Sequence, residues 1–196
     1  MADAPTPSPS APNAPAPGAP GTAAPSPTVR KVVDAFPGAG IVPGEFRGQW
    51  WIEVPRERTL EVLRFLRDDP GLGFSFLEDV TCLDYPEQEP RFRAVYTLTS
   101  IARRERIRVK TACPEEDPVV PSATPLWAGA NWLEREAYDM FGVRFEGHPD
   151  LRRILMPEDF DSFPLRKEFP MEGERSDRDW AKWVIERARR PEGDPL

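Results

Sequence analysis

The distribution of prolines most constrains where this chain can form regular secondary structure. The sequence of 196 residues contains 25 prolines, which are concentrated towards its two ends. A proline removes a backbone hydrogen-bond donor and holds the preceding residue in extended geometry. The length suffices for one ordinary domain with extensions. We therefore expect one folded body between end segments of a different kind.

The first end segment is residues 1–28. It holds one charged side chain, Asp3, and no aromatic residue. A segment of this composition buries too little apolar surface to offset the chain entropy lost on folding. We predict a disordered Pro/Ala-rich tail over residues 1–28, for which the role of a spacer is favoured over that of a docking segment.

Residues 29–147 carry patterns typical of strands and helices. Ile107 and Val109 alternate with basic residues, as on a strand that has one solvated face. Leu63 and Leu66 recur at the spacing of one helix face. We predict strands at Gln49–Val54, Phe74–Tyr85, Arg91–Ser100 and Arg104–Ala112, and helices at Arg56–Asp69 and Asn131–Phe141.

The second predicted helix belongs to a helical region that we expect to begin near Ser122. Gly142 is placed to end that helix as a C-cap. Residues 29–147 are therefore predicted to form an α+β core domain, in which helices pack on a small, mostly antiparallel sheet.

The pattern changes at residue 148. Residues 148–175 show no sustained periodicity of apolar residues, and prolines recur in them at near-regular intervals. The segment is nevertheless too apolar for a free linker, with Leu151, Phe160 and Phe169 among its side chains. We predict an extended arm that wraps a partner. Residues 176–196 are predicted to form an amphipathic helix, N-capped by Ser176, and a short tail.

Charge and hydropathy exclude several functions. The formal net charge of −7 argues against binding to nucleic acid or to anionic lipid, since both need a basic surface. No window holds the roughly 18 consecutive apolar residues of a membrane span. The N-terminus also lacks the features of a secretory signal. We expect a cytosolic protein, or one held at a membrane only through partners.

The residues available for cofactor chemistry are few. The chain has two cysteines, Cys82 and Cys113, and a single histidine, His148. An iron–sulfur cluster or a structural zinc generally takes four such ligands. Phosphate-binding glycine motifs are missing as well. We therefore expect no cofactor, no metal and no catalytic residue on this chain.

The acidic helix at 134–139 and the basic loop at 147–153 are the main candidates for a site. Glu134 and Glu136 point to different faces of a helix, so a structural role is favoured over paired acid–base catalysis. Arg135 and Asp139 can pair at i,i+4 spacing. A remaining alternative is a small hydrolase that uses Glu134 or Glu136 together with His148.

Four sequence strings carry a resemblance to a known family. They are LEDVTCLDY at 77–85, WLEREAYDMFG at 132–142, GHPDLRRIL at 147–155 and PLRKEFP at 164–170. Together they closely resemble the signature of the C-type family of NADH–quinone oxidoreductase subunits, the thirty-kilodalton subunit of respiratory complex I. The resemblance covers about residues 46 to 170. Ser162 departs from it, because the family usually has glycine there.

The resemblance implies a cofactor-free structural subunit in the hydrophilic arm of the complex. Its expected partners are the large quinone-site subunit, which the C-terminal arm would wrap, and neighbouring hydrophilic-arm subunits. FMN and iron–sulfur clusters would be held by partner subunits. Electron transfer from NADH to quinone, coupled to proton translocation, would belong to the assembly. The expected location is the cytoplasmic face of the bacterial plasma membrane, reached through the complex.

The residues that match the signature are the predicted partner interface. They are Glu134, Arg135, Glu136, Asp139, Gly142, His148, Pro149, Asp150, Arg152, Arg153, Pro164, Arg166 and Lys167. We expect Arg152 to be buried against an acceptor in the partner. The same role in a related membrane-bound hydrogenase-type complex is an alternative that the sequence does not separate.

Overall fold

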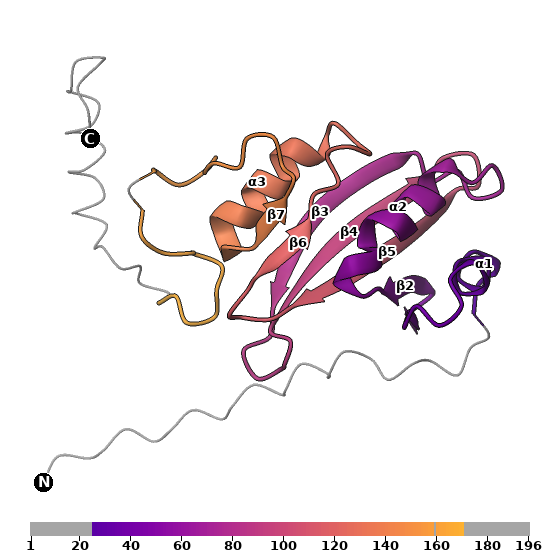
Figure 1. Ribbon diagram of the computed structural model, residues 1–196, viewed down its shortest axis with the longest axis horizontal. Helices are drawn as coiled ribbons and strands as arrows, with labels where there is room; N and C mark the ends of the chain where they lie inside the picture. The colour runs from indigo at the N-terminus through magenta and orange to yellow at the C-terminus, as the bar shows by residue number, and fades with distance from the viewer. Residues whose placement is uncertain (1–24, 159, 171–196) are drawn as a thin grey trace, which may run out of the picture.

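A five-stranded sheet forms the centre of the computed structural model, which describes residues 25–158 and 160–170 (Figure 1). The strands lie in the order β1-β2-β5-β4-β3, and β6 and β7 form a second, two-stranded sheet. The helices α2 and α3 lie on the same face of the large sheet (Figure 1). This arrangement confirms the predicted α+β class.

The strands of the large sheet follow the predicted segments, with one addition. They are β1 (Val42–Phe46), β2 (Gln49–Glu53), β3 (Phe76–Asp84), β4 (Phe92–Ser100) and β5 (Glu105–Cys113). Antiparallel pairing joins β3, β4 and β5, whereas β2 pairs with β5 in parallel. The additional strand is β1, whose Pro43 and Gly44 obscure its alternating pattern. Proline is tolerated there because β1 is an edge strand.

The helices of the described residues are α1 (Pro27–Ala35), the 3-10 helix η1 (Arg56–Arg58), α2 (Thr59–Asp68) and α3 (Ala130–Phe141). The sequence did not predict α1, which starts within the segment expected to be a tail. The Ser26 hydroxyl caps α1 by accepting a hydrogen bond from the Val29 N–H at 3.2 Å. Pro27 lies in the first turn, where a missing N–H costs nothing.

The segment before α3 corrects a further prediction. Residues 122–129 form turns instead of the expected helical start. Pro125 is consistent with this, because a proline disfavours helical geometry at the preceding residue. The helix α3 begins at Ala130 and ends at Gly142, which has φ 76°. The flanking strands β6 (Val119–Pro121) and β7 (Arg144–Glu146) pair in parallel and were not predicted.

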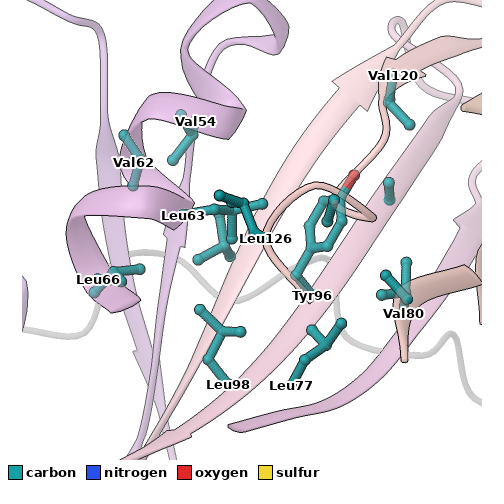
Figure 2. Close-up of a cluster of buried hydrophobic side chains, with 14 of the residues drawn as sticks. Val54, Val62, Leu63, Leu66, Leu77, Val80, Tyr96, Leu98, Val120 and Leu126 are labelled. Atoms are coloured by element: carbon teal, nitrogen blue, oxygen red, sulfur yellow. The ribbon is translucent and has the colours of Figure 1, made fainter. Parts of the chain in front are cut away.

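The hydrophobic core lies between the large sheet and the helices. Leu63 and Leu66 of α2 and Tyr96 and Leu98 of β4 are fully buried in it (Figure 2). Burying one such leucine contributes about 1.5–3 kcal/mol. The core therefore fixes where α2 and α3 lie, and α3 in turn positions the candidate site.

Residues 148–170 form no helix or strand where the structure describes them, and they bend and turn at 154–156 and 164–169 instead of staying extended. They run beside α3 and return to the body of their own chain, where the Leu165 N–H donates to the Met140 carbonyl at 3.1 Å. This return was not predicted. The tail up to residue 24 and the predicted helix after residue 175 lie outside the described residues. Within the described part, no helix has the length and apolar character needed to cross a bilayer.

Candidate functional site

The carboxylate of Asp139 joins α3 to the arm. Its side chain is fully buried, and its Oδ2 accepts hydrogen bonds from three consecutive N–H groups, those of Ile154 (3.0 Å), Leu155 (2.7 Å) and Met156 (2.8 Å). Its Oδ1 accepts a hydrogen bond from Arg153 at 2.6 Å. One helix residue thus fixes a whole turn of the arm.

Two opposing effects set the charge of Asp139. Burial alone would raise its pKa. The Met156 N–H, the Arg153 guanidinium and the other arm N–H groups outweigh burial and lower the pKa below its usual range. Asp139 is therefore ionised at neutral pH, and it serves as an anchor rather than as a proton donor.

Arg153 extends this anchor further along the arm. Its guanidinium donates to the carbonyls of Phe160 (2.6 Å) and Ser162 (3.1 Å). It also lies 5.3 Å from the centroid of the Phe163 ring. Within this chain, Arg153 forms an ion pair with Asp139.

Arg135 also binds the arm, and its predicted pair with Asp139 does not form. The buried Arg135 side chain donates to the carbonyls of Arg152 (3.1 Å) and Arg153 (3.0 Å). Its guanidinium lies 5.1 Å from the centroid of the Trp132 ring. Arg135 and Asp139 do lie one helical turn apart on α3, but each binds the arm instead of the other.

Gly142 leaves the space in which the arm crosses the end of α3. With φ 76°, it adopts a left-handed conformation that favours glycine. A Cβ built there would lie 2.6 Å from the Phe163 ring and 2.7 Å from Nη2 of Arg166. The Arg166 side chain also donates to the Phe141 carbonyl at 2.7 Å. Gly142 is therefore needed for both the backbone and the packing.

A second anchor, which sequence reasoning missed, lies at the end of β3. The buried Asp84 forms a two-pronged ion pair with Arg91, at 2.7 and 2.9 Å. Oδ2 of Asp84 also accepts a hydrogen bond from the Lys167 N–H at 2.7 Å, and Arg91 pairs with Glu168 of the arm. Only the joint occurrence of Asp84 and Arg91 around a Pro-rich turn hinted at this pair in the sequence.

Glu134 and Glu136 point in different directions, as predicted. Glu136 is exposed, whereas Glu134 is fully buried. The Glu134 carboxyl accepts hydrogen bonds from the Ser122 hydroxyl and the Ala123 N–H, both at 2.6 Å. Burial raises the pKa of Glu134 to about 7, and these hydrogen bonds oppose the rise only in part. Glu134 thus holds the turn before α3.

We expect Glu134→Gln to remove a pH dependence of stability. A glutamate with an ordinary pKa of 4.5 in the unfolded chain and a pKa of about 7 in the fold binds more protons when folded between those values. The free energy of unfolding therefore falls as the pH rises from about 4.5 to about 7, by on the order of 3 kcal/mol. Glutamine keeps one acceptor for Ala123 and can donate to Ser122.

Urea unfolding of the full chain at several pH values between about 5 and 8 measures this effect, because that window spans the raised pKa of Glu134. Relative to the parent chain, Glu134→Gln should gain free energy of unfolding as the pH rises across this window. Glu136→Gln is the matched control, because the Glu136 side chain is exposed. Parallel curves for Glu134→Gln and the parent chain would contradict the prediction.

The remaining predicted residues lie around the arm. Nε2 of His148 lies 3.1 Å from the Asn131 carbonyl, and its Nδ1 accepts a hydrogen bond from the Asp150 N–H at 3.0 Å. Both ring nitrogens are therefore engaged in hydrogen bonds to the backbone. Pro149 is exposed and Pro164 is half-buried.

Arg152 lies at the surface of this chain. Within this chain its side chain is 63% exposed and pairs with Asp150 at 2.9 Å. Burial of Arg152 against a partner stays a prediction. Among the described residues, no group of three or more potential ligands is arranged to hold a metal ion.

The fold and this site define a small α+β protein whose arm is fastened to the helix α3 of the same chain. The sequence matches the family model "Respiratory-chain NADH dehydrogenase, 30 Kd subunit" over residues 52–175. It is 51% identical over 150 residues to the C-type NADH-quinone oxidoreductase subunit of Roseiflexus castenholzii, covering 76% of this chain and 86% of that protein. The chain therefore belongs to the family of 30-kDa subunits of respiratory-chain NADH dehydrogenase.

Other relatives agree with this assignment. The C-type subunit from Citrifermentans bemidjiense is 50% identical over 145 residues, which are 74% of this chain and 89% of that protein. A solved trypsin-resistant fragment of Nqo5 is 38% identical, with a TM-score of 0.57 over 63% of this chain and 99% of the fragment. A chain of an archaeal membrane-bound sulfane sulfur reductase covers 86% of this chain with a TM-score of 0.62, but at 21% identity it shows a shared fold alone.

Proposed function

We propose that this chain is a structural subunit in the hydrophilic arm of an NADH–quinone oxidoreductase, with no catalytic or cofactor site of its own. It supports NADH-to-quinone electron transfer, coupled to proton translocation, by holding neighbouring subunits together. FMN and the iron–sulfur clusters lie in those subunits, and the large quinone-site subunit is the main partner. Contact with the membrane, at its cytoplasmic face, is made through the complex.

One observation carries this proposal: large apolar side chains on the arm and on the adjacent α3 stay exposed. Asp139 and Arg153 bind the arm to α3. Trp132 and Leu155 are each 62% exposed, and Leu165 is 52% exposed. Exposed apolar side chains on a rigidly held segment favour a protein partner, since burying them stabilises a complex by about 25 cal/mol per Å².

The anchors also change which residues are expected to face the partner. The predicted interface included Arg135, Asp139 and Arg153 as contacts that set the register of the arm. Their hydrogen bonds lie within this chain, so their part in the interface is to preform the arm. A preformed arm loses less conformational entropy on binding than a flexible one.

The alternatives have less support. The relatives from Roseiflexus castenholzii and Citrifermentans bemidjiense carry the name NADH-quinone oxidoreductase, so an equivalent subunit of a hydrogenase-type complex is not favoured. A hydrolase that uses His148 with Glu134 or Glu136 is not favoured either. Glu134 is buried, Glu136 is exposed, and both nitrogens of His148 are engaged.

We expect the double variant Leu155→Ser with Leu165→Ser to lower assembly without unfolding the chain. Both side chains are largely exposed, so their loss should change the stability of the isolated chain by under about 1 kcal/mol. The fraction of the tagged chain that co-purifies with the oxidoreductase should fall about tenfold.

Ile101→Ser is the matched control, because Ile101 is 69% exposed in the turn between β4 and β5, away from the arm. It should leave assembly unchanged. Full assembly of the double variant would show that these exposed side chains do not bind a partner, and this would contradict the proposal.

A further inference from the structure

One face of the large sheet is covered by no helix of the described residues. The core, α2 and α3 occupy the other face (Figure 1). Strand register places a defined set of side chains on the uncovered face, since residues paired across strands share a face. We call this face the open face, and its centre is formed by Trp51, Glu53, Arg93, Thr97, Arg108 and Lys110. No hydrogen bond or ion pair described between the arm and the body involves it.

Cations crowd the centre of the open face, although the chain carries a formal net charge of −7. Arg106 is paired with Glu78 at 2.8 Å, and Arg93 is paired with Glu53 at 3.3 Å. Arg108 and Lys110 form no ion pair with any described residue, and Arg108 donates to the neutral Gln49 side chain at 2.5 Å. These two cations, neighbours on one face of β5, are therefore available to a partner's carboxylates.

Neighbouring side chains hold Lys110 and Arg93 in place. The Lys110 ammonium lies 4.0 Å from the centroid of the Trp51 ring, and that ring lies over Gly44, where a Cβ would be 2.0 Å from it. Partial burial lowers the pKa of Lys110. Nη1 of Arg93 is buried and has no hydrogen-bond partner among the described residues.

Apolar side chains flank these cations. Val42 (51% exposed) and Phe46 (54% exposed) lie on β1, and Phe76 (52% exposed) lies on β3 at the opposite edge. Aromatic and arginine side chains together are typical of protein–protein interfaces. Glu53 and Asp79 on the same face argue against nucleic acid and lipid headgroups, which favour an unbroken basic surface.

We propose that the open face is a second docking surface, which binds an acidic segment of another subunit of the oxidoreductase. Carboxylates of that segment pair with Arg108 and Lys110, while its apolar side chains lie against Trp51 and Val42. The inference rests on the proposed function, because it takes the partner from the same complex. It assigns a surface opposite to the one that carries the arm.

The first test reverses charge on the open face. We expect Arg108→Glu with Lys110→Glu to lower the fraction of the tagged full chain in the complex by about tenfold. The matched control is Arg30→Glu with Arg64→Glu, which makes the same change of charge at exposed positions on α1 and α2. Equal assembly of the two double variants would overturn the proposal.

A second test avoids charge reversals that could destabilise the sheet. The photoreactive amino acid benzoylphenylalanine replaces Thr97, which lies next to Arg108 on the open face. Irradiation of the assembled complex should join this position to an Asp- and Glu-rich peptide of another subunit. A cross-link to this chain itself, to a second copy or to lipid would contradict the proposal.

The two tests separate this inference from the proposed function. The chain could be found in the oxidoreductase while benzoylphenylalanine at position 97 forms no cross-link. In that case the open face is exposed to solvent, and only this inference fails. If the chain is absent from the oxidoreductase, the proposed function fails together with it.

Discussion

Replacing Asp139 with Asn should destabilise the chain by about 3–5 kcal/mol, the cost of removing one partner of a buried ion pair. One carboxylate oxygen accepts three arm N–H groups, and the other accepts a hydrogen bond from Arg153 at 2.6 Å. An asparagine side chain has the same shape but only one acceptor oxygen. Either the arm N–H groups or Arg153 would then face an amide donor.

The effect of Asp139→Asn should be local as well as global. Hydrogen exchange followed by mass spectrometry reports on the amides of residues 154–156, which should lose their protection. Asp150→Asn is the control, because Asp150 pairs with Arg152 at an exposed position. It should cost under about 1 kcal/mol. Unchanged protection of residues 154–156 in Asp139→Asn would show that the carboxylate does not hold the arm.

Gly142→Ala is the second substitution with a large expected effect, of about 2–4 kcal/mol. Part of this cost is the strain of a Cβ at φ 76°, which is about 1 kcal/mol. The remainder comes from displacing Phe163, whose ring lies 2.6 Å from the new Cβ. The end of the arm should therefore separate from α3 and lose protection from hydrogen exchange.

Gly48→Ala isolates the backbone contribution. Gly48 has φ 78°, but nothing lies within 4 Å of a Cβ built there. Urea unfolding of both variants should give a smaller loss for Gly48→Ala, and the difference measures the packing of Phe163 on Gly142. Equal losses would mean that the arm does not pack closely at Gly142.

Elements with a sustained period could be predicted from the sequence. Leu63 and Leu66 identified α2, and the alternation of Ile107 and Val109 identified β5. Shorter or interrupted elements could not be predicted in this way. The strands β6 and β7 have three residues each, which is too short for a pattern, and Pro43 and Gly44 obscured β1.

Some residues of the site were singled out from the sequence, but the bonds between them were not. Asp139 and Arg153 were identified, yet their mutual pair was not, because a chain return between residues 14 positions apart leaves no periodic signal. Local spacing instead favoured the pair of Arg135 with Asp139. The Asp84–Arg91 anchor was missed for the same reason, since its meaning depends on Lys167, which is 83 positions away from Asp84.

Affinity purification of the tagged chain from gently solubilised membranes of its own host is the most direct test of the proposed structural role. Mass spectrometry and a visible spectrum of the purified material identify what accompanies the chain. We predict an NADH-oxidising assembly that contains flavin and iron–sulfur clusters, together with a large quinone-site subunit. Recovery of the chain alone, from the soluble fraction, would contradict this role.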